Sequence, residues 1–297
     1  MYNSMYMLEL VLSIESLIMT LLLVAFYIMS ERKVLSYIQL RKGPNKVGIM
    51  GLLQSFADFI KLINKSKFNN FSFRSWFSLL GCIVLISCSV SMVIVYSLVN
   101  SNIWCNWILL YFLVVGSIVS YSTLLIGWCS WSKYSLISSI RVSFSSVMFE
   151  MILMCIMILF GLMYGGYSNP SVSSVMLFIA PLAFIAWLIV LLSESNRTPC
   201  DYSESESELV SGISVEYSSV LFLVIFACEY LIMFIFSWVS FIVFWSINEI
   251  LIVINLMLFV VMRGSFSRLR FDIFVSVVWN YCVVVILVYL ICLFSLL

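Results

Sequence analysis

The 297-residue sequence contains no histidine, and only 10% of its residues are charged. Without histidine the chain cannot provide bis-histidine haem ligation, a histidine-rich copper site or a histidine-based catalytic triad. Soluble domains contain about 25% charged residues, so this composition, with 64% hydrophobic residues, excludes a soluble globular protein and a disordered chain. The formal net charge of +1 excludes the basic field of a nucleic-acid binder. The composition is typical of a polytopic helical membrane protein.

Cysteine is present, but in no pattern that binds metal. The nine cysteines form no Cys-x-x-Cys pair, and most lie in apolar runs, where thiols behave as small hydrophobic side chains. The sequence also has neither a calcium-binding loop pattern nor a dinucleotide-binding fingerprint. We therefore expect this chain to bind no cofactor and no metal, and any redox centre to belong to another subunit.

Apolar runs dominate the sequence, and eight of them are long enough, or nearly so, to cross a bilayer as helices of about 20 residues. We expect an all-α polytopic protein: one membrane domain over residues 1–297 with about eight transmembrane helices. Apolar residues recur at helical spacing over residues 49–63, after the Gly43-Pro44 turn, which predicts an amphipathic interfacial helix after the first span. A helix that covers a partner protein is the alternative. The expected spans are residues 5–30, 76–99, 107–128, 144–163, 174–193, 218–240, 246–262 and 274–297.

All fifteen lysine and arginine residues lie in four of the connections between these spans. The other connections, such as residues 100–106 and 164–174, contain none. The positive-inside rule places the charged connections in the cytoplasm or the matrix. An even number of spans then puts both termini on the opposite side. The four expected matrix loops are residues 31–75, 129–143, 194–217 and 263–273.

Acidic residues stand where a charged group costs about 2.5–3.5 kcal/mol at the centre of a membrane helix. Glu15, Glu150 and Glu229 fall inside expected spans, and residues 194–208 form a dense acidic loop. Such carboxyls can exchange protons near neutral pH; the alternative is a neutral, hydrogen-bonded carboxyl that only joins helices. The acidic loop is either a solvated face or a water-filled funnel that feeds protons or a polar headgroup towards the membrane.

These motifs resemble the subunit 1 family of NADH:ubiquinone oxidoreductase, respiratory complex I, over nearly the whole chain. The resemblance is carried by segments in or beside the expected matrix loops: Glu31–Asn45, Gly127–Tyr134 with Arg141 and Glu150, Glu194–Tyr217, and Arg263–Asp272. Within these segments the sequence departs from the family pattern at Cys200, Ser205 and Ser267, and in the sixth span at Cys228. None of these departures removes a charge.

The resemblance implies a multi-pass subunit of the mitochondrial inner membrane, at the heel of the membrane arm, where the peripheral arm docks and a quinone tunnel enters from the bilayer. It implies a ubiquinone-type quinone as substrate, and quinone, membrane lipids and other complex I subunits as partners. Residues that line the tunnel or dock the peripheral arm correspond to Arg32, Arg41, Phe226, Arg263, Arg268 and Arg270. The acids of the proton relay correspond to Glu150, Glu194, Asp201, Glu204, Glu206, Glu216 and Glu229.

The expected function is therefore that of a core complex I subunit that couples quinone reduction to proton translocation. From composition alone, a stand-alone proton-coupled membrane transporter is the rival interpretation. Such transporters show paired broken helices at matching positions, whereas Pro170 and Pro181 lie near one span and have no counterpart. A purely structural anchor would not need the acids inside the membrane.

Overall fold

The computed structural model describes an all-helical chain, as expected from the sequence. The described part of the chain contains helices, turns and connections but no strand. The backbone is described for residues 2–65, 73–100, 107–167, 175–203, 206–245 and 250–296. Side chains are described for residues 11–65, 75–99, 107–167, 176–203, 208–245 and 252–295.

Long helices are joined by connections of different lengths, some of which contain short helical turns. The elements in chain order are α1 (Tyr2–Ile38), η1 (Ile49–Gly51), α2 (Gln54–Asn64), α3 (Phe73–Asn100), α4 (Ile108–Cys129), α5 (Lys133–Tyr164), α6 (Val175–Ile179), α7 (Pro181–Glu194), α8 (Glu206–Leu209), η2 (Gly212–Glu216), α9 (Val220–Phe244), α10 (Ile250–Ser265), α11 (Phe271–Val277), η3 (Val278–Val283) and α12 (Val284–Leu296).

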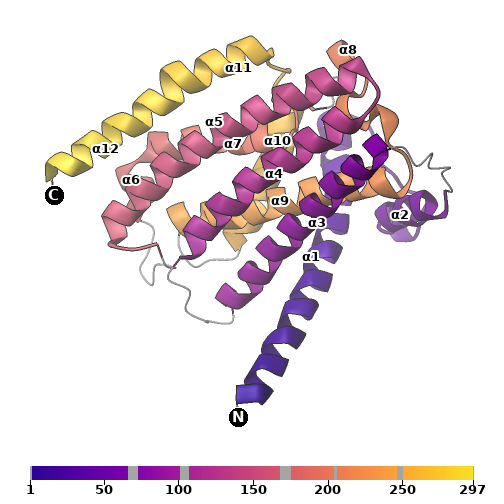
Figure 1. Cartoon of the computed structure of the whole chain (residues 1–297), viewed down its shortest axis with the longest axis horizontal. Coiled ribbons are helices and arrows are strands. Elements are labelled where there is room, and N and C mark those ends of the chain that lie inside the picture. The colour runs from indigo at the N-terminus through magenta and orange to yellow at the C-terminus, as the bar shows by residue number, and fades with distance from the viewer. Residues whose placement is uncertain are drawn as a thin grey trace.

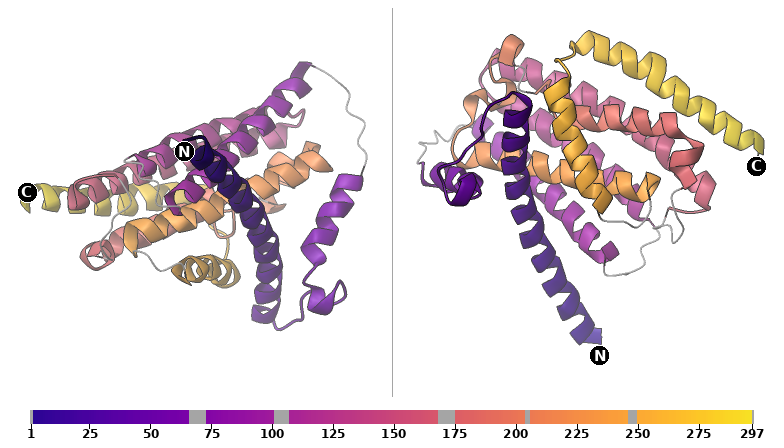
Figure 2. Two further views of the ribbon diagram at one scale, coloured as in Figure 1. Left: turned by 90° about the horizontal axis from the view of Figure 1, so that it is seen from below. Right: turned by 180° about the vertical axis from the view of Figure 1, so that it is seen from behind.

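The helices form a bundle in which α3, α4 and α5 lie side by side, with α9 packed behind α3 and α7 behind α5 (Figure 1). The N-terminal half of α1 extends away from this bundle, and α11 to α12 run along its opposite edge (Figures 1 and 2). The end of α1, the start of α5 and the start of α11 lie towards the same end of the bundle (Figures 1 and 2). We call this the basic end, because Arg32, Lys133 and Arg270 lie there.

Within the described residues, six helices are long and apolar enough to cross a membrane: the segments from α1, α3, α4, α5, α9 and the continuous α11–α12. Two further apolar helices, α7 and α10, are shorter. They fall on the expected spans 174–193 and 246–262, part of which lies outside the described residues. The first of these spans is broken at Ala180, whose backbone leaves the helical region (φ −128°, ψ 63°), and α7 restarts with Pro181 at its first position.

The helix α5 begins at Lys133, well before residue 144, so most of the expected loop 129–143 is helical. The Ser132 side chain caps this helix by accepting a hydrogen bond from the Ser135 backbone N–H at 3.2 Å. At the other end Gly165 adopts a left-handed conformation (φ +68°) and its N–H bonds to the Gly161 carbonyl at 2.9 Å. Local capping therefore extends this helix beyond the apolar run.

The middle of the bundle is built around α9. Its Phe236 ring meets Phe149 of α5 edge-on at 4.8 Å between centroids, and its Phe244 ring meets Phe184 of α7 at 5.2 Å. Most side chains of α9 from residue 230 onwards are buried. The aromatic rings of this helix are thus held in a densely packed frame, and its single acid, Glu229, lies directly before the fully buried stretch.

The helix α2 lies beside the bundle and is tied to α1. Phe56 packs edge-on against Phe26 of α1 at 5.7 Å, and Arg32 of α1 forms an ion pair of 2.6 Å with Asp58. Its other apolar side chains, such as Ile60, remain exposed. A helix is therefore present where the sequence predicts one, with one apolar face towards α1 and another uncovered.

Candidate functional site

A cavity of about 550 Å³ lies between α1, α9 and α10, with one side chain contributed by α3. Its lining is almost entirely apolar. Leu23, Phe26 and Val253 line it and are exposed, so they mark its mouth on the outer surface of the bundle. Small-molecule sites in proteins have volumes of about 300–1,000 Å³ and apolar walls with few polar groups. This cavity could therefore hold a long apolar ligand that enters from the side.

Three of the four hydroxyl-bearing side chains that line the cavity lie at its inner end, towards the basic end of the bundle, and the fourth, Tyr96, comes from α3. Tyr27, Ser30 and Tyr230 line the cavity there. The Tyr230 hydroxyl donates a hydrogen bond of 2.8 Å to Glu31 Oε2, and Glu31 Oε1 pairs with Arg263 of α10. Because the Glu31 side chain is only 6% exposed, its two bonds join α1, α9 and α10 through a nearly dry carboxylate.

A second arginine reaches this junction from the loop after α7. The Arg197 guanidinium lies over the Tyr230 ring, 4.4 Å from its centroid, and 5.8 Å from the centroid of Phe226. Phe226 in turn packs on Phe222 at 4.4 Å. Guanidinium groups are attracted to aromatic faces at such distances. Phe226 is thus one helical turn from the cavity and supports Arg197.

A second, small cavity of about 20 Å³ lies deeper in the bundle, enclosed by α3, α4, α5, the end of α7 and α9. Glu194 and Glu229 both line it. Glu150 of α5 lies beside it. Ser120, which also lines the cavity, places its Oγ 3.5 Å from Glu150 Oε1, and the carboxyls of Glu150 and Glu194 are close enough to interact electrostatically. The structure thus brings together three acids that are far apart in the sequence, in one acid cluster.

An ion pair and a backbone hydrogen bond connect the loops at the basic end. Arg141 near the start of α5 forms an ion pair with Glu208 of α8. This hydrogen bond, with the positive charges of Arg268 and Arg270, lowers the pKa of the Glu208 carboxyl below its usual value. The backbone N–H of Leu269 also bonds to the Pro199 carbonyl at 3.0 Å, after a cis peptide at that proline. Three expected matrix loops therefore pack as one surface.

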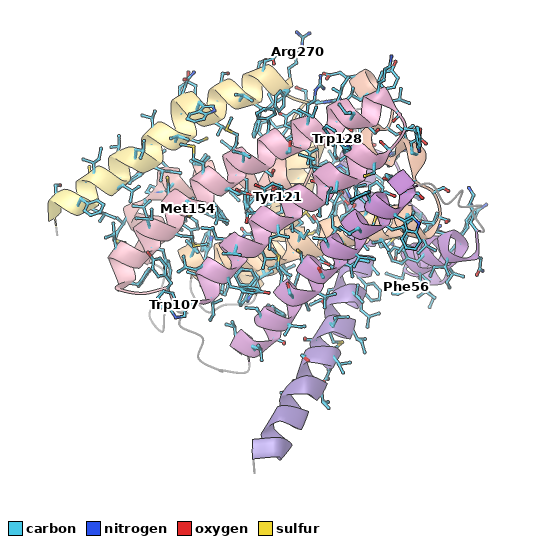
Figure 3. The ribbon with its side chains drawn as sticks, viewed as in Figure 1. Phe56, Trp107, Tyr121, Trp128, Met154 and Arg270 are labelled. Carbon is cyan, nitrogen blue, oxygen red and sulfur yellow. The ribbon has the colours of Figure 1, made fainter. Side chains whose placement is uncertain are left out.

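The other predicted residues lie apart from both cavities. Arg32 pairs with Asp58, and Arg41 is exposed in the turn after α1. Arg270 is exposed at the edge of the basic end, where Figure 3 labels it. Asp201 is partly buried in a turn and Glu216 is exposed at the end of η2. Glu204 lies outside the described residues, as does the side chain of Glu206.

Sequence reasoning did not assign a role to Glu31, Tyr230 or Asn196, although all three are buried at the two cavities. Glu31 was visible as the acid beside Arg32, but nothing in the spacing indicates that it faces Arg263, more than 200 residues away. Among the described residues, no group of three or more cysteines and acids is arranged to hold a metal ion.

The helical bundle, with a lateral apolar cavity and a group of neighbouring acids among its apolar helices, is that of a polytopic membrane protein. A model of the NADH dehydrogenase family matches residues 12–294. NADH-ubiquinone oxidoreductase chain 1 of the tick Rhipicephalus sanguineus is 34% identical, over 89% of this chain and 87% of its own length. The same protein of the mussel Mytilus edulis is 33% identical (95% and 96%), and that of the goldfish Carassius auratus 36% (88% and 86%). The chain therefore belongs to this family, which disfavours a stand-alone transporter.

Proposed function

We propose that this chain is a core membrane-arm subunit of respiratory complex I in the mitochondrial inner membrane. In this role it forms the quinone-access tunnel and part of the proton relay that couples electron transfer from NADH to ubiquinone to proton translocation. Its partners are the other complex I subunits, the quinone and the membrane lipids. The observation that carries the proposal is the apolar cavity that opens on the outer surface of the bundle and ends at the polar groups around Glu31.

The cavity has the two properties that an isoprenoid quinone requires. Its mouth consists of exposed apolar side chains, so a lipid-soluble tail can enter without crossing water. Its inner end presents hydroxyl groups and a compensated charge pair, which can hold a polar headgroup on its way out of the membrane. The chain contains no histidine. We therefore assign the hydrogen-bond donors that hold the headgroup during its reduction to a peripheral-arm subunit.

Two neighbouring residues of α10 give a matched test of the tunnel. Val253 lines the mouth of the cavity, whereas Ile254 is similarly exposed but does not line it. Val253→Trp should raise the KM for long-tailed quinones several-fold in the intact complex, while Ile254→Trp should not. In both variants the rate of NADH oxidation with an artificial electron acceptor should be unchanged, which shows that the peripheral arm is intact. Equal quinone kinetics for the two variants would place the tunnel elsewhere.

The acid cluster supports the relay. Carboxylates that lie close together cannot all be ionised cheaply, so Glu150, Glu194 and Glu229 should titrate as a coupled group. Such a group can take up and release protons when a nearby charge changes. The acids of the loop, Asp201, Glu204, Glu206 and Glu216, would connect this group with the matrix.

Amide substitutions test the relay. Glu229→Gln keeps the size of the side chain but removes an exchangeable proton. We expect the complex to assemble and oxidise NADH with artificial acceptors, but to lose most quinone-linked turnover and proton pumping. Glu15→Gln is the control, because Glu15 is an exposed acid on α1 far from the cluster. If Glu229→Gln and Glu150→Gln both pump at the parental rate, these carboxyls are structural.

The two ends of α4 support a membrane position for the bundle. Trp107 and Trp128 are exposed at its two ends, as labelled in Figure 3. At 1.5 Å per residue they lie about 32 Å apart, close to the ~30 Å thickness of the bilayer core, and tryptophan favours both interfaces. We infer that α6–α7 and α10 also cross, giving eight spans, and that α2 lies in the interface. The positive-inside rule then predicts that the basic end faces the matrix and, with eight spans, that both termini face the intermembrane side.

A further inference from the structure

The small cavity in the acid cluster contains a polar atom without a partner. Asn196 is 6% exposed and lines the cavity together with Glu194 and Glu229. Its side-chain oxygen Oδ1 is buried and accepts no hydrogen bond from the described part of the chain. An unsatisfied buried acceptor costs free energy, and buried polar groups in folded proteins nearly always have a partner.

The size and lining of the cavity identify the missing donor. A cavity needs at least about 10–15 Å³ to hold one water molecule, and this one has about 20 Å³. A buried water also needs two to four polar partners. Asn196, the two glutamates and the hydroxyl-bearing side chains of Thr123 and Ser146 line the same space.

We propose that Asn196 is a positioning residue that holds a single water molecule between Glu194 and Glu229. The water donates one hydrogen bond to Asn196 Oδ1, and its remaining hydrogen and lone pairs face the two carboxyls. It bridges them for proton transfer: one carboxyl gives a proton to the water oxygen as the water passes another proton to the second carboxyl. The inference rests on the proposed relay and adds the element that connects its acids.

The backbone explains why an asparagine suits this position. Asn196 has a left-handed conformation (φ +49°), which asparagine tolerates better than most residues, and its N–H bonds to the Ser193 carbonyl at 3.3 Å. Its amide oxygen accepts a hydrogen bond but does not titrate. Asn196 therefore orients the water without competing with the carboxyls for the transferred proton.

Val142 of α5 offers a test in which packing and hydration predict opposite outcomes. It is buried and lines the cavity. Val142→Ile adds one methylene group into the cavity and should displace the water, whereas Val142→Ala enlarges the cavity and keeps it hydrated. We expect Val142→Ile to lower proton-coupled quinone turnover about tenfold or more, and Val142→Ala to lower it less. Turnover is compared per assembled complex. If Val142→Ala lowers it more than Val142→Ile does, the Val142 side chain acts through packing and the water bridge is wrong.

Val119→Ile fills the same cavity from α4 and repeats the test if Val142→Ile does not assemble. High-resolution cryo-electron microscopy of the intact parent complex should show one water within hydrogen-bond distance of Asn196 Oδ1, and Val142→Ile should lack it. A dry cavity, or a protein donor bonded to Asn196 Oδ1, overturns the inference about the water. This holds even if Glu229→Gln stops pumping, a result that would support the relay itself. An ordered water with normal pumping in Glu229→Gln instead overturns the relay that the water is proposed to serve.

Discussion

The junction of Glu31, Arg263 and Tyr230 allows an asymmetric prediction, because its two charges differ in exposure. The side chain of Glu31 is 6% exposed and that of Arg263 is 29% exposed. Removing one partner of a buried ion pair costs about 3–5 kcal/mol, because the other charge stays buried and uncompensated. Arg263→Met leaves the buried Glu31 carboxylate without its positive partner, so the loss of stability should approach this value. Glu31→Gln leaves Arg263 unpaired but partly exposed. We expect this variant to lose about 1.5–3 kcal/mol of stability, the contribution of a hydrogen bond to a charged group.

The assay is the half-life of quinone-linked activity of the detergent-solubilised complex at raised temperature. Since each 1.4 kcal/mol changes a rate about tenfold, Arg263→Met should shorten this half-life about a hundredfold if the junction opens before inactivation. The double variant Glu31→Gln/Arg263→Met should be more stable than Arg263→Met alone, because no carboxylate is stranded. Equal half-lives for the two single variants, or additive losses in the double variant, would refute the reasoning.

Other predictions follow from the loops at the basic end. Cys200 is buried and burial raises its pKa to about 11, so a maleimide at pH 8 should label exposed Cys292 but not Cys200, as read by mass spectrometry. Gly212→Ala should reduce the amount of assembled complex on native gels, because its Cβ would lie 1.7 Å from a backbone oxygen at a φ of +52°. Arg141→Gln should speed proteolysis of the loop around Glu208 modestly, since a partly exposed pair contributes only about 0.2–1 kcal/mol. Its pairing lowers the Glu208 pKa, so the effect should be present at pH 7, weaken as the pH falls below the usual glutamate pKa and disappear below the lowered pKa of Glu208. High salt should also remove it.

The fold class was predictable because a bilayer restricts the chain to apolar helices, and runs of about 20 apolar residues are visible in any sequence. The ends of the helices were less predictable. The helix α5 starts at Lys133 because the Ser132 side chain caps it, and serine is too common in this sequence to mark a cap. The break at Ala180 was more visible, since Pro181 follows it.

The acids of the candidate site were recognised because a glutamate in an apolar run is conspicuous. Their mutual arrangement was not, since helical spacing gives the face of a residue but not which helix it meets. Glu150, Glu194 and Glu229 gather because α5, α7 and α9 pack together. The relevance of Asn196 depends on a cavity, and a cavity is a property of packing that periodicity does not encode.

Two short segments connect the apolar cavity with the acid cluster. On α9, Glu229 lines the small cavity while the next residue, Tyr230, lines the large one. After α7, Asn196 faces the small cavity while the next residue, Arg197, lies over the Tyr230 ring. A displacement of Arg197 or Tyr230 would therefore reach the adjacent Asn196 and Glu229 through one peptide unit, with no need for a long chain of contacts. Close packing favours movement of such a segment as a unit rather than smooth deformation. For the proposed function, we therefore expect occupancy of the apolar cavity to change the geometry of the acid cluster.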